Sequence, residues 1–274
     1  MSNPRWPNGA RCAVALTFDV DAESPFLFQP GGETRPKALS IGTYGPLRGL
    51  PRILEVLERH RLRATFFVPG WTIDHWPDAV RQVAHAGHEV AIHGYLHEEF
   101  SSLTDVQQRA CHERALRSAE KLLGRRPVGV RPPGEYTPDT LRIIWEMGFL
   151  YDSNMRGDDR PYRVRIGGEL TKLVEICPHW ELDDGPYFSF GFGSGYAPLR
   201  IQSPETAYES WRQEFDGYYH DGLCYVLMTH PELTGTPGRA LMLERLIEYM
   251  KRHEDVWFAT CEDIARWWLE SGQP

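Results

Sequence analysis

Residues 89–97 have the sequence EVAIHGYLH, in which a short apolar run is followed by two histidines four positions apart. A short apolar run of this kind is typical of a buried strand. Two imidazoles at this spacing lie on one face of a helical turn, so His93 and His97 can point at one ion. The stretch therefore predicts a pair of metal ligands at the point where a buried strand ends.

A second stretch, AVALTFDVD at residues 13–21, has a similar form, because an apolar run ends in Asp19 and Asp21. The carboxyl ends of neighbouring parallel strands meet at one rim. If the two strands are such neighbours, two carboxylates and two imidazoles converge there. Two histidines and one carboxylate make a three-ligand site with open positions, which is the geometry of a catalytic metal rather than a structural one.

Strand-like runs alternate with helical patterns along the chain. The predicted strands are residues 11–18, 64–68, 89–92, 128–131, 149–151, 173–177, 224–229 and 256–260. Because most of these runs are continuously apolar, they favour a parallel sheet covered by helices. Seven or eight such units suit a closed or nearly closed barrel. We therefore expect an α/β fold, a TIM-like (β/α)7–8 barrel, with residues 1–274 forming a single domain.

Other stretches carry weaker signals. Residues 22–45 are rich in Gly and Pro and predict a loop. Residues 178–203 combine Gly, Pro and aromatic residues without a helical period, which favours a functional lid or wall over a linker. Four further histidines fall in helical or loop stretches and are interpreted as solvated or capping residues: His75, His85, His88 and His112.

Arg131 and His230 also stand at the ends of predicted strands, so they join the candidate site. A divalent ion lowers the pKa of bound water from ~16 toward ~7 and polarises a carbonyl oxygen. One aspartate can bind the ion while the other acts as a general base, kept ionised by Arg131. His230 can protonate a departing amine. This set predicts metal-assisted hydrolysis of an amide or ester, with zinc as the default ion and cobalt, manganese or iron as alternatives.

Each signal also has a simpler structural interpretation. The histidine pair alone is a weak motif, and the aspartate pair could cap a turn. His230 precedes a proline and could be a turn residue, and Arg131 could bridge a surface carboxylate. Trp180 could serve packing alone. The joint placement of these residues at strand ends is what favours the functional interpretation.

Composition limits the partners. The chain has 274 residues, is 41% hydrophobic and carries a formal charge of -8. With no basic tract, we expect no nucleic-acid or membrane partner. No apolar run approaches the roughly 18 residues of a membrane span. Residues 1–7 lack the apolar core of a secretory signal, so we expect a cytoplasmic location. Five scattered cysteines predict buried free thiols: Cys12, Cys111, Cys177, Cys224 and Cys261.

At these residues the sequence resembles the polysaccharide deacetylases of the nodulation-protein-B homology group, carbohydrate esterase family 4. The matching motifs are TFDVD at 17–21, HGYLH at 93–97, VRPP at 130–133 and LMTH at 227–230. The resemblance implies a distorted (β/α) barrel. It also implies a role for each motif residue: Asp19 as base, Asp21, His93 and His97 as metal ligands, Arg131 as the residue that orients the base, and His230 as acid.

Some positions depart from most members of that family. Val20 separates the two aspartates, and Gly94 follows the first histidine. Together with VEI at 174–176 and Trp180-x-x-Asp183-Asp184, these departures look like an intracellular branch of peptidoglycan-deacetylase-like proteins and cyclic imide hydrolases. That branch implies a homotetramer, a covered barrel mouth and a small substrate. The substrate contacts expected from the resemblance are Trp180, Asp183 and Pro132.

Four functions follow from these features. The first is a metal-dependent deacetylase of an N-acetylated sugar, and the second is a cyclic amide or imide hydrolase with the same ion and water. Related allantoin-hydrolysing members work without metal and lack the aspartate pair, so retention of Asp19 and Asp21 favours a bound ion. The third is a non-haem iron oxygenase, which shares the two-histidine, one-carboxylate set. The fourth is a metal-binding or carbohydrate-binding protein without catalysis.

Overall fold

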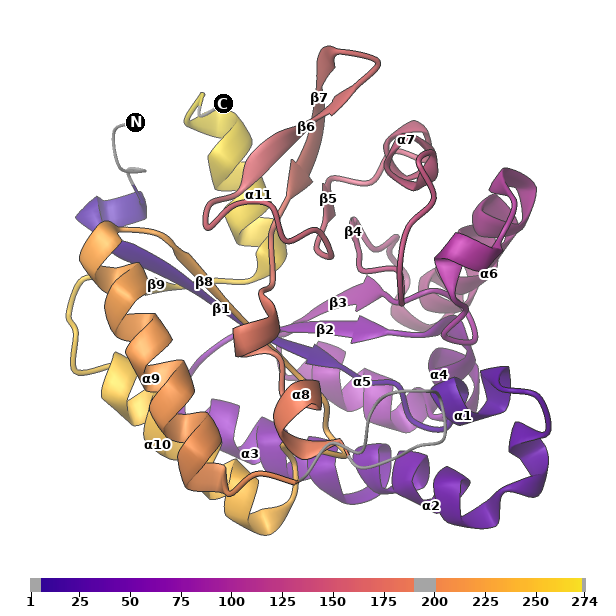
Figure 1. The fold of residues 1–274 in the computed structure, drawn as a ribbon, viewed down its shortest axis with the longest axis horizontal. Coiled ribbons are helices and arrows are strands. Elements are labelled where there is room, and N and C mark those ends of the chain that lie inside the picture. The colour runs from indigo at the N-terminus through magenta and orange to yellow at the C-terminus, as the bar shows by residue number, and fades with distance from the viewer. Residues whose placement is uncertain (1–5, 190–200, 273–274) are drawn as a thin grey trace.

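The computed structural model describes residues 6–189 and 201–272, and a curled sheet of nine strands forms the centre of that part of the chain (Figure 1). The strands are β1 (Cys12–Asp19), β2 (Thr65–Val68), β3 (Glu89–Ile92), β4 (Gly129–Val130), β5 (Tyr151–Asp152), β6 (Tyr162–Ile166), β7 (Glu169–Glu175), β8 (Cys224–Thr229) and β9 (Val256–Phe258).

Helices surround this sheet. They are α1 (Ser24–Phe28), α2 (Pro36–Tyr44), α3 (Leu50–His60), α4 (Gly70–His75), α5 (Pro77–His85), α6 (Asp105–Leu123), α7 (Thr140–Glu146), α8 (Gly185–Phe188), α9 (Pro204–Asp221), α10 (Pro237–Met250) and α11 (Cys261–Glu270). Shorter turns are η1 (Pro7–Gly9), η2 (Gly32–Thr34), η3 (Gly45–Gly49), η4 (Phe100–Ser102) and η5 (Trp180–Leu182). The expected α/β alternation is confirmed.

The sheet order is β6-β7-β5-β4-β3-β2-β1-β8, and β9 also pairs with β1. The pairs are parallel except for the antiparallel hairpin of β6 and β7. After β7 the chain returns to β8, where Asp183 forms a parallel bridge with Met228. This bridge joins the segment that follows β7 to β8, so that segment partly closes the barrel formed by the curled sheet.

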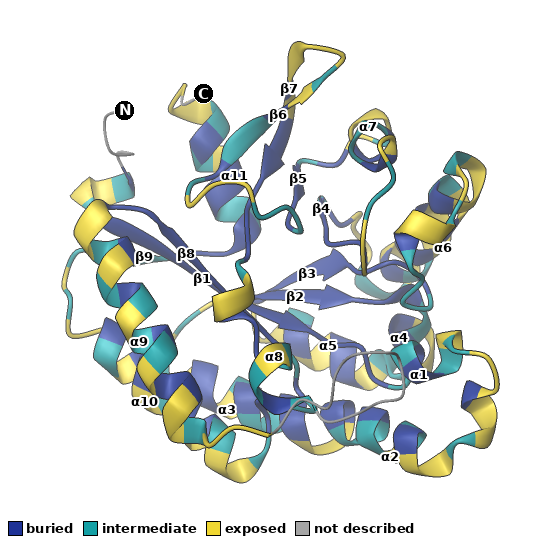
Figure 2. Ribbon diagram, in the orientation of Figure 1, coloured by how far each residue is buried: buried dark blue, intermediate teal, exposed yellow. Residues whose placement is uncertain are grey.

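Alternate residues of β1 face two different cores. Ala13 and Ala15 pack in an inner cluster with Phe67 and Val226, whereas Val14 and Leu16 pack outward against helices such as α3, α9 and α10. Small residues fit the narrow interior of a barrel, and large ones fill the wider layer outside it. Figure 2 shows β1, β2, β3 and β8 as the buried centre of the molecule, whereas the hairpin of β6 and β7 projects from it and is partly exposed. The even positions and the odd positions of β1 therefore have distinct roles.

Helix α11 closes the barrel at the amino ends of the strands. The Glu89 carboxylate, at the start of β3, accepts hydrogen bonds from Thr65 Oγ1 (2.7 Å), Tyr151 Oη (2.7 Å) and the backbone N–H of Glu262 (3.0 Å). Glu262 lies in the first turn of α11, whose backbone N–H groups favour a negative charge. This buried hydrogen-bond network fills the amino end of the barrel, so the opposite, carboxyl end is the one available for a functional site.

The loop expected at residues 22–45 is wrong, since the structure places α1, η2 and α2 there. Pro36 stands at the first turn of α2, where its missing N–H costs no helical hydrogen bond. Gly42 allows the helix to approach the backbone of Ala22, because a Cβ at this position would overlap the Ala22 carbonyl group. These residues therefore serve helix initiation and close packing. The hairpin of β6 and β7 also extends the sheet beyond the predicted strand at 173–177.

The interpretation of His88 and His112 as solvated or capping residues is also wrong. His88 is buried, and burial together with the charge of Arg63 lowers its pKa to about 4. His112 is fully buried on α6 against Phe100 and Phe149, with ring centroids 4.9 and 5.6 Å away. Burial lowers the pKa of His112 to about 3, and neither ring nitrogen has a hydrogen-bond partner in the described part of the chain.

The expectation of buried free thiols is confirmed. All five cysteines are buried and unpaired. The described residues contain no helix that is both long and apolar enough to span a bilayer. The segment expected as a lid or wall, 178–203, contains η5 and α8, and its residues 190–200 lie outside the described part.

Replacement of Gly49 should destabilise the fold. A Cβ at this end of η3 would overlap the carbonyl oxygen of Pro231, in the turn that follows β8. We expect Gly49→Ala to lower the free energy of unfolding by about 1–3 kcal/mol, measured by urea denaturation. Gly217→Ala is the matched control, because Gly217 is helical and has open space around it. The control should be neutral or stabilising by up to about 1 kcal/mol. Equal destabilisation by both changes would contradict this packing argument.

Acid should destabilise the protein partly through His112. The unfolded chain takes up a proton on this residue below its ordinary pKa of 6.5, whereas the folded chain resists protonation down to about 3. The folded state therefore loses stability as the pH falls below 6.5, by about 2 kcal/mol at pH 5. His112→Leu should remove that share of the pH dependence in urea unfolding at pH 7 and pH 5. His85→Leu, at an exposed position of α5, should leave the dependence unchanged.

Candidate metal centre and active site

The functional side chains follow the inward-facing positions of four parallel strands. Asp19 ends β1 and continues the inner series of Ala13, Ala15 and Thr17, because side chains alternate along a strand. His93, Arg131 and His230 directly follow β3, β4 and β8. All four therefore lie at the carboxyl end of the barrel, where the sequence predicted them to meet.

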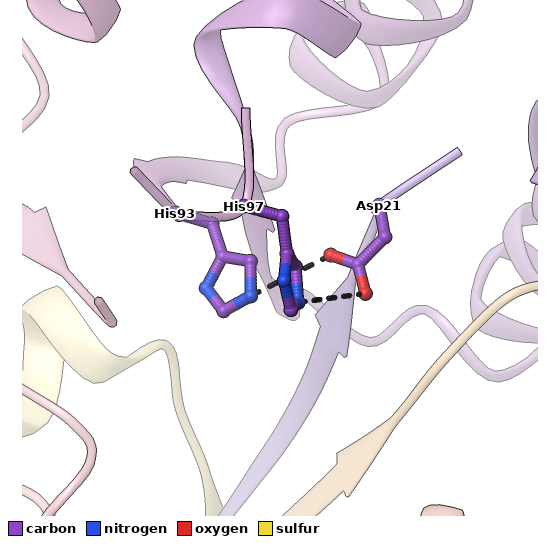
Figure 3. A group of neighbouring side chains, drawn as sticks. All are labelled: Asp21, His93 and His97. Atoms are coloured by element: carbon purple, nitrogen blue, oxygen red, sulfur yellow. Dashed lines mark ion pairs between the residues drawn. The ribbon is translucent and has the colours of Figure 1, made fainter. Parts of the chain in front are cut away.

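Asp21, His93 and His97 form a three-residue cluster (Figure 3). His93 Nε2 lies 3.5 Å from Asp21 Oδ1, and His97 Nε2 lies 3.5 Å from Asp21 Oδ2. Around a tetrahedral ion with bonds of about 2.1 Å, ligand atoms lie about 3.4 Å apart. Both histidine–aspartate distances are therefore close to the separation expected for two ligand atoms on one divalent cation.

Two further observations fit a cation. Asp21 Oδ1 is buried and has no hydrogen-bond partner among the described residues, so this oxygen is left for another ligand. His93 Nδ1 lies in hydrogen-bonding range of the carbonyl oxygen of Arg131. A carbonyl oxygen can only accept, so Nδ1 donates and Nε2 keeps its lone pair toward the cluster. Burial lowers the pKa of His93, which also favours the neutral, metal-binding ring.

The backbone that joins the two histidines is not the expected helical turn. Gly94 and His97 both have left-handed conformations, with φ of +64° and +58°. A Glu98 carboxylate oxygen accepts the backbone N–H of Tyr95 at 2.9 Å, which stabilises the turn. A compact non-helical turn therefore brings His93 and His97 together, where the sequence led us to expect a helical turn. A Cβ at Gly94 would meet Glu98 and Pro133 at 3.0 and 3.2 Å, so glycine suits both the space and the conformation.

Asp19 lies beside the cluster and is held ionised. Its Oδ1 accepts a hydrogen bond from Arg131 Nη1 at 2.6 Å, and its Oδ2 lies 3.9 Å from His93 Nε2. Burial alone would raise the pKa of Asp19, but the Arg131 guanidinium, with His93 and His230, outweighs it and lowers that pKa. A buried carboxylate that stays ionised next to a metal site has the properties of a general base.

Arg131 is itself fixed by several contacts. Its Nε donates to the Ser153 carbonyl at 2.7 Å, Nη2 to Ser153 Oγ at 2.9 Å and Nη1 to Thr17 Oγ1 at 3.1 Å. Its guanidinium also stacks on Phe67, 4.0 Å from the ring centroid. It is 1% exposed, so the sequence-based alternative of a surface bridge is wrong.

His230 is oriented by Asp184, a residue whose role sequence reasoning missed. His230 Nδ1 lies 2.6 Å from Asp184 Oδ1, and the backbone N–H of His230 donates to Asp184 Oδ2 at 2.9 Å. Burial would lower the pKa of His230, but the charge and hydrogen bond of Asp184 raise it well above the ordinary value. His230 Nε2 lies 3.8 Å from Asp21 Oδ2, so a protonated imidazole faces the cluster. The sequence signal was the pair Asp183-Asp184, which does not reveal which carboxylate faces the histidine.

Asp183, Asp184 and His230 also lie close enough together to hold an ion. However, the atoms that would bind an ion already make hydrogen bonds within the protein. Both Asp184 oxygens accept hydrogen bonds from His230, and Oδ2 also accepts Thr234 Oγ1 at 2.6 Å. Asp183 Oδ1 accepts the Gly185 N–H at 2.8 Å. This second group is therefore better suited to orienting His230 than to holding a metal.

The three expected substrate contacts differ in exposure. Trp180 is 60% exposed on η5, Asp183 is buried, and Pro132 is buried directly after Arg131. Burial raises the pKa of Asp183 to about 6.

Glu232 is a further acid that the sequence did not single out. Burial, and then the charge of Asp21, raises its pKa to about 8, so Glu232 is mostly neutral at pH 7.

Comparisons with known proteins find relatives that align with most of this chain. A family model described as polysaccharide deacetylase matches residues 8–151. A peptidoglycan deacetylase of Helicobacter pylori is 32% identical over 277 residues, covering 92% of this chain and 94% of that protein. A peptidoglycan deacetylase-like protein of Gibberella zeae is 26% identical, covering 95% of this chain and 88% of that protein.

Solved structures show the same fold across the whole chain. A Mycobacterium smegmatis protein assigned as a polysaccharide deacetylase has 39% identity and a TM-score of 0.94, covering 100% of this chain and 96% of that one. An allantoinase structure has 26% identity and a TM-score of 0.87, covering 100% of this chain and 95% of that one. The similarity therefore spans every element that carries the candidate site.

The cluster geometry predicts which substitutions abolish metal binding. His93→Ala removes one of three ligands and should weaken divalent-ion affinity by more than the roughly 10- to 100-fold that follows loss of an outer-shell partner. Asp19→Asn should retain the ion, because Asp19 pairs with Arg131. His220→Ala, at an exposed position, controls for the loss of a histidine. Elemental analysis and metal titration measure all three. Full metal content in His93→Ala would remove this residue from the ligand set.

Proposed function

The chain belongs to the polysaccharide deacetylase family, and from this premise we propose that it is a metal-dependent hydrolase of carbon–nitrogen bonds other than peptide bonds. The proposed substrate is an N-acetylated sugar, from which the enzyme releases acetate. The name of the Helicobacter pylori relative supports this class, since that peptidoglycan deacetylase aligns with 92% of this chain. The observation in the structure that supports this proposal is one cluster that could hold a metal ion, flanked by Asp19, whose pKa is lowered by Arg131, and by His230, whose pKa is raised by Asp184.

Asp21, His93 and His97 would hold the divalent cation. Zinc is the default for a site of two imidazoles and one carboxylate, and cobalt, manganese and iron also suit this mixed donor set. A cation in this position supplies Lewis acidity, which activates water and polarises the amide oxygen. The Arg131 carbonyl would keep His93 in the tautomer that binds the ion.

Asp19 and His230 would carry the proton transfers. Asp19, ionised by its contact with Arg131, would accept a proton from the attacking water. His230, protonated and oriented by Asp184, would donate its Nε2 proton to the departing nitrogen. The carbon–nitrogen bond breaks as that nitrogen takes up the proton, which yields a carboxylate and an amine.

Trp180, Asp183 and Pro132 are the proposed substrate contacts. Trp180 offers an exposed aromatic face on η5, of the kind that packs against a sugar ring. Asp183 precedes the residue that orients His230, and Pro132 follows Arg131, so both lie beside the proposed machinery.

A cyclic amide or imide hydrolase is the second candidate. The observation in its favour is the allantoinase structure, whose TM-score of 0.87 extends over 100% of this chain. The same water, base and acid could open a ring at its carbon–nitrogen bond. The oxygenase hypothesis and that of a non-catalytic binding protein find less support, because the parallel barrel carries candidate groups for both proton transfers.

The homotetramer and the cytoplasmic location expected from the family branch remain proposals. Light scattering of the purified protein tests the first, and fractionation of the source cells tests the second.

Hydrolysis assays with protein of known metal content test the proposed function. We expect acetate release from N-acetylglucosamine oligomers, loss of activity after chelation and recovery with added zinc. Asp19→Asn should retain the ion but lower kcat by at least about 100-fold, as expected for a lost general base. Ring opening of hydantoin or succinimide without acetate release would replace the first candidate with the second. Hydrolysis that persists in Asp19→Asn would exclude Asp19 as the base.

A further inference from the structure

A positively charged side chain at the rim of the site has no acidic partner. Arg156 lies four residues after the end of β5, at the carboxyl end of the sheet. Its guanidinium stacks 3.9 Å from the ring centroid of Trp180, and Nη1 donates to the Pro178 carbonyl at 2.7 Å. No ion pair joins Arg156 to a carboxylate of the described residues, and the undescribed stretches 1–5, 190–200 and 273–274 contain no Asp or Glu.

The charge of Arg156 is nevertheless close to the reacting groups. The pKa of Arg156 is lowered, mainly by burial. The negative charges of Asp183 and Asp19 oppose this effect, and the positive charge of Arg131 adds to it. Arg131 donates hydrogen bonds to Ser153, three positions before Arg156, so the same segment holds both guanidinium groups. Arg156 therefore lies in the same short segment that fixes Arg131 at the carboxyl end of the sheet.

Arg156 differs in its partners from the other cationic side chains of the site. Arg131 pairs with Asp19 and His230 with Asp184, whereas no carboxylate of the described residues forms an ion pair with Arg156. A positive charge at the rim that no direct contact neutralises attracts an anionic ligand.

The contacts of Arg156 also leave part of its guanidinium free. Trp180 covers one face of the group, and Pro178 uses a single N–H of Nη1. The remaining N–H groups lie in the guanidinium plane, where two parallel donors match the two oxygens of a carboxylate. Because the indole holds this plane, less rotamer entropy is lost when an anion binds.

We propose that Arg156, supported by Trp180, binds a carboxylate group on the substrate, so that the enzyme prefers amides that carry an acid group over neutral ones. This inference rests on the proposed hydrolase function, because it places the acid group beside the scissile amide. It holds for either candidate reaction, since an acylated amino sugar and a cyclic imide can both carry a carboxylate.

Matched substrate pairs test the proposal. N-acetylmuramic acid differs from N-acetylglucosamine by a carboxylate-bearing ether group. 5-Carboxymethylhydantoin differs from hydantoin by a carboxymethyl group. We expect the wild-type holoenzyme to favour the acidic member by about 10- to 100-fold in kcat/KM, mainly through KM. Arg156→Gln should reduce the ratio of the two kcat/KM values to within about twofold, because only the acidic member loses a charged contact. Arg156→Lys should keep part of the preference, because lysine keeps the positive charge but lacks the two parallel N–H donors of the guanidinium.

Arg11→Gln is the matched control. Arg11 also stacks on an aromatic ring, that of Tyr219, and donates to backbone carbonyl groups, but it precedes β1 at the amino end of the sheet. Its replacement should leave both kcat/KM values and their ratio unchanged. An equal loss with both substrates in Arg156→Gln would show a purely structural contact and overturn the proposal.

A binding measurement separates this proposal from the proposed function. Calorimetry with the metal-loaded Asp19→Asn protein measures the affinity for the acidic compounds without turnover. Adding Arg156→Gln should weaken that affinity by about 10- to 100-fold and leave any contact with the metal ion in place. Retained Arg156-dependent binding without hydrolysis in the wild type would reject the function but keep the anion site. Unchanged affinity in the double variant would reject the anion site whatever the activity.

Discussion

The site depends on the buried guanidinium of Arg131. This one group pairs with Asp19 and donates a hydrogen bond to Thr17, which lies on the same strand as Asp19. It also donates to both the carbonyl and the hydroxyl oxygen of Ser153. The carbonyl group of Arg131 lies in hydrogen-bonding range of Nδ1 of His93. Removing one partner of a buried ion pair typically costs about 3–5 kcal/mol, so these contacts are mutually reinforcing. The ionisation of the proposed base and the tautomer of a proposed metal ligand thus have a common structural origin.

The strand geometry explains why these groups meet. In a barrel of parallel strands, every second side chain points inward, and the interior here is lined by small residues such as Ala13, Ala15 and Ala91. Asp19 and His93 continue those inward series beyond the last small residue. The interior therefore changes from apolar to charged at the carboxyl end, whereas Glu89 and α11 close the amino end with a satisfied polar network.

The segment between β7 and α9 contributes more than a wall. Its described residues include Asp184, which orients His230, and Trp180, which supports Arg156. This segment thus contacts His230, the proposed acid, through Asp184 and contacts Arg156 through Trp180. This arrangement links the position of the proposed acid to the position of the proposed substrate contacts. The segment is therefore the part of the fold in which a change of sequence can alter substrate choice while the metal ligands stay in place.

The sequence by itself was sufficient to predict the α/β barrel and the meeting of Asp19, Asp21, the two histidines, Arg131 and His230 at one rim, because strand periodicity and strand ends are local properties of the backbone. The separate roles proposed for the two aspartates came from the family resemblance. The tertiary structure decided how those groups are held. His93 and His97 converge through left-handed residues in place of a helical turn, and His112 is buried because two distant aromatic rings enclose it. His230 pairs with Asp184, 46 positions away, and not with Asp183. Adjacent carboxylates look alike in a sequence, and only the packing of distant segments fixes which one faces the imidazole.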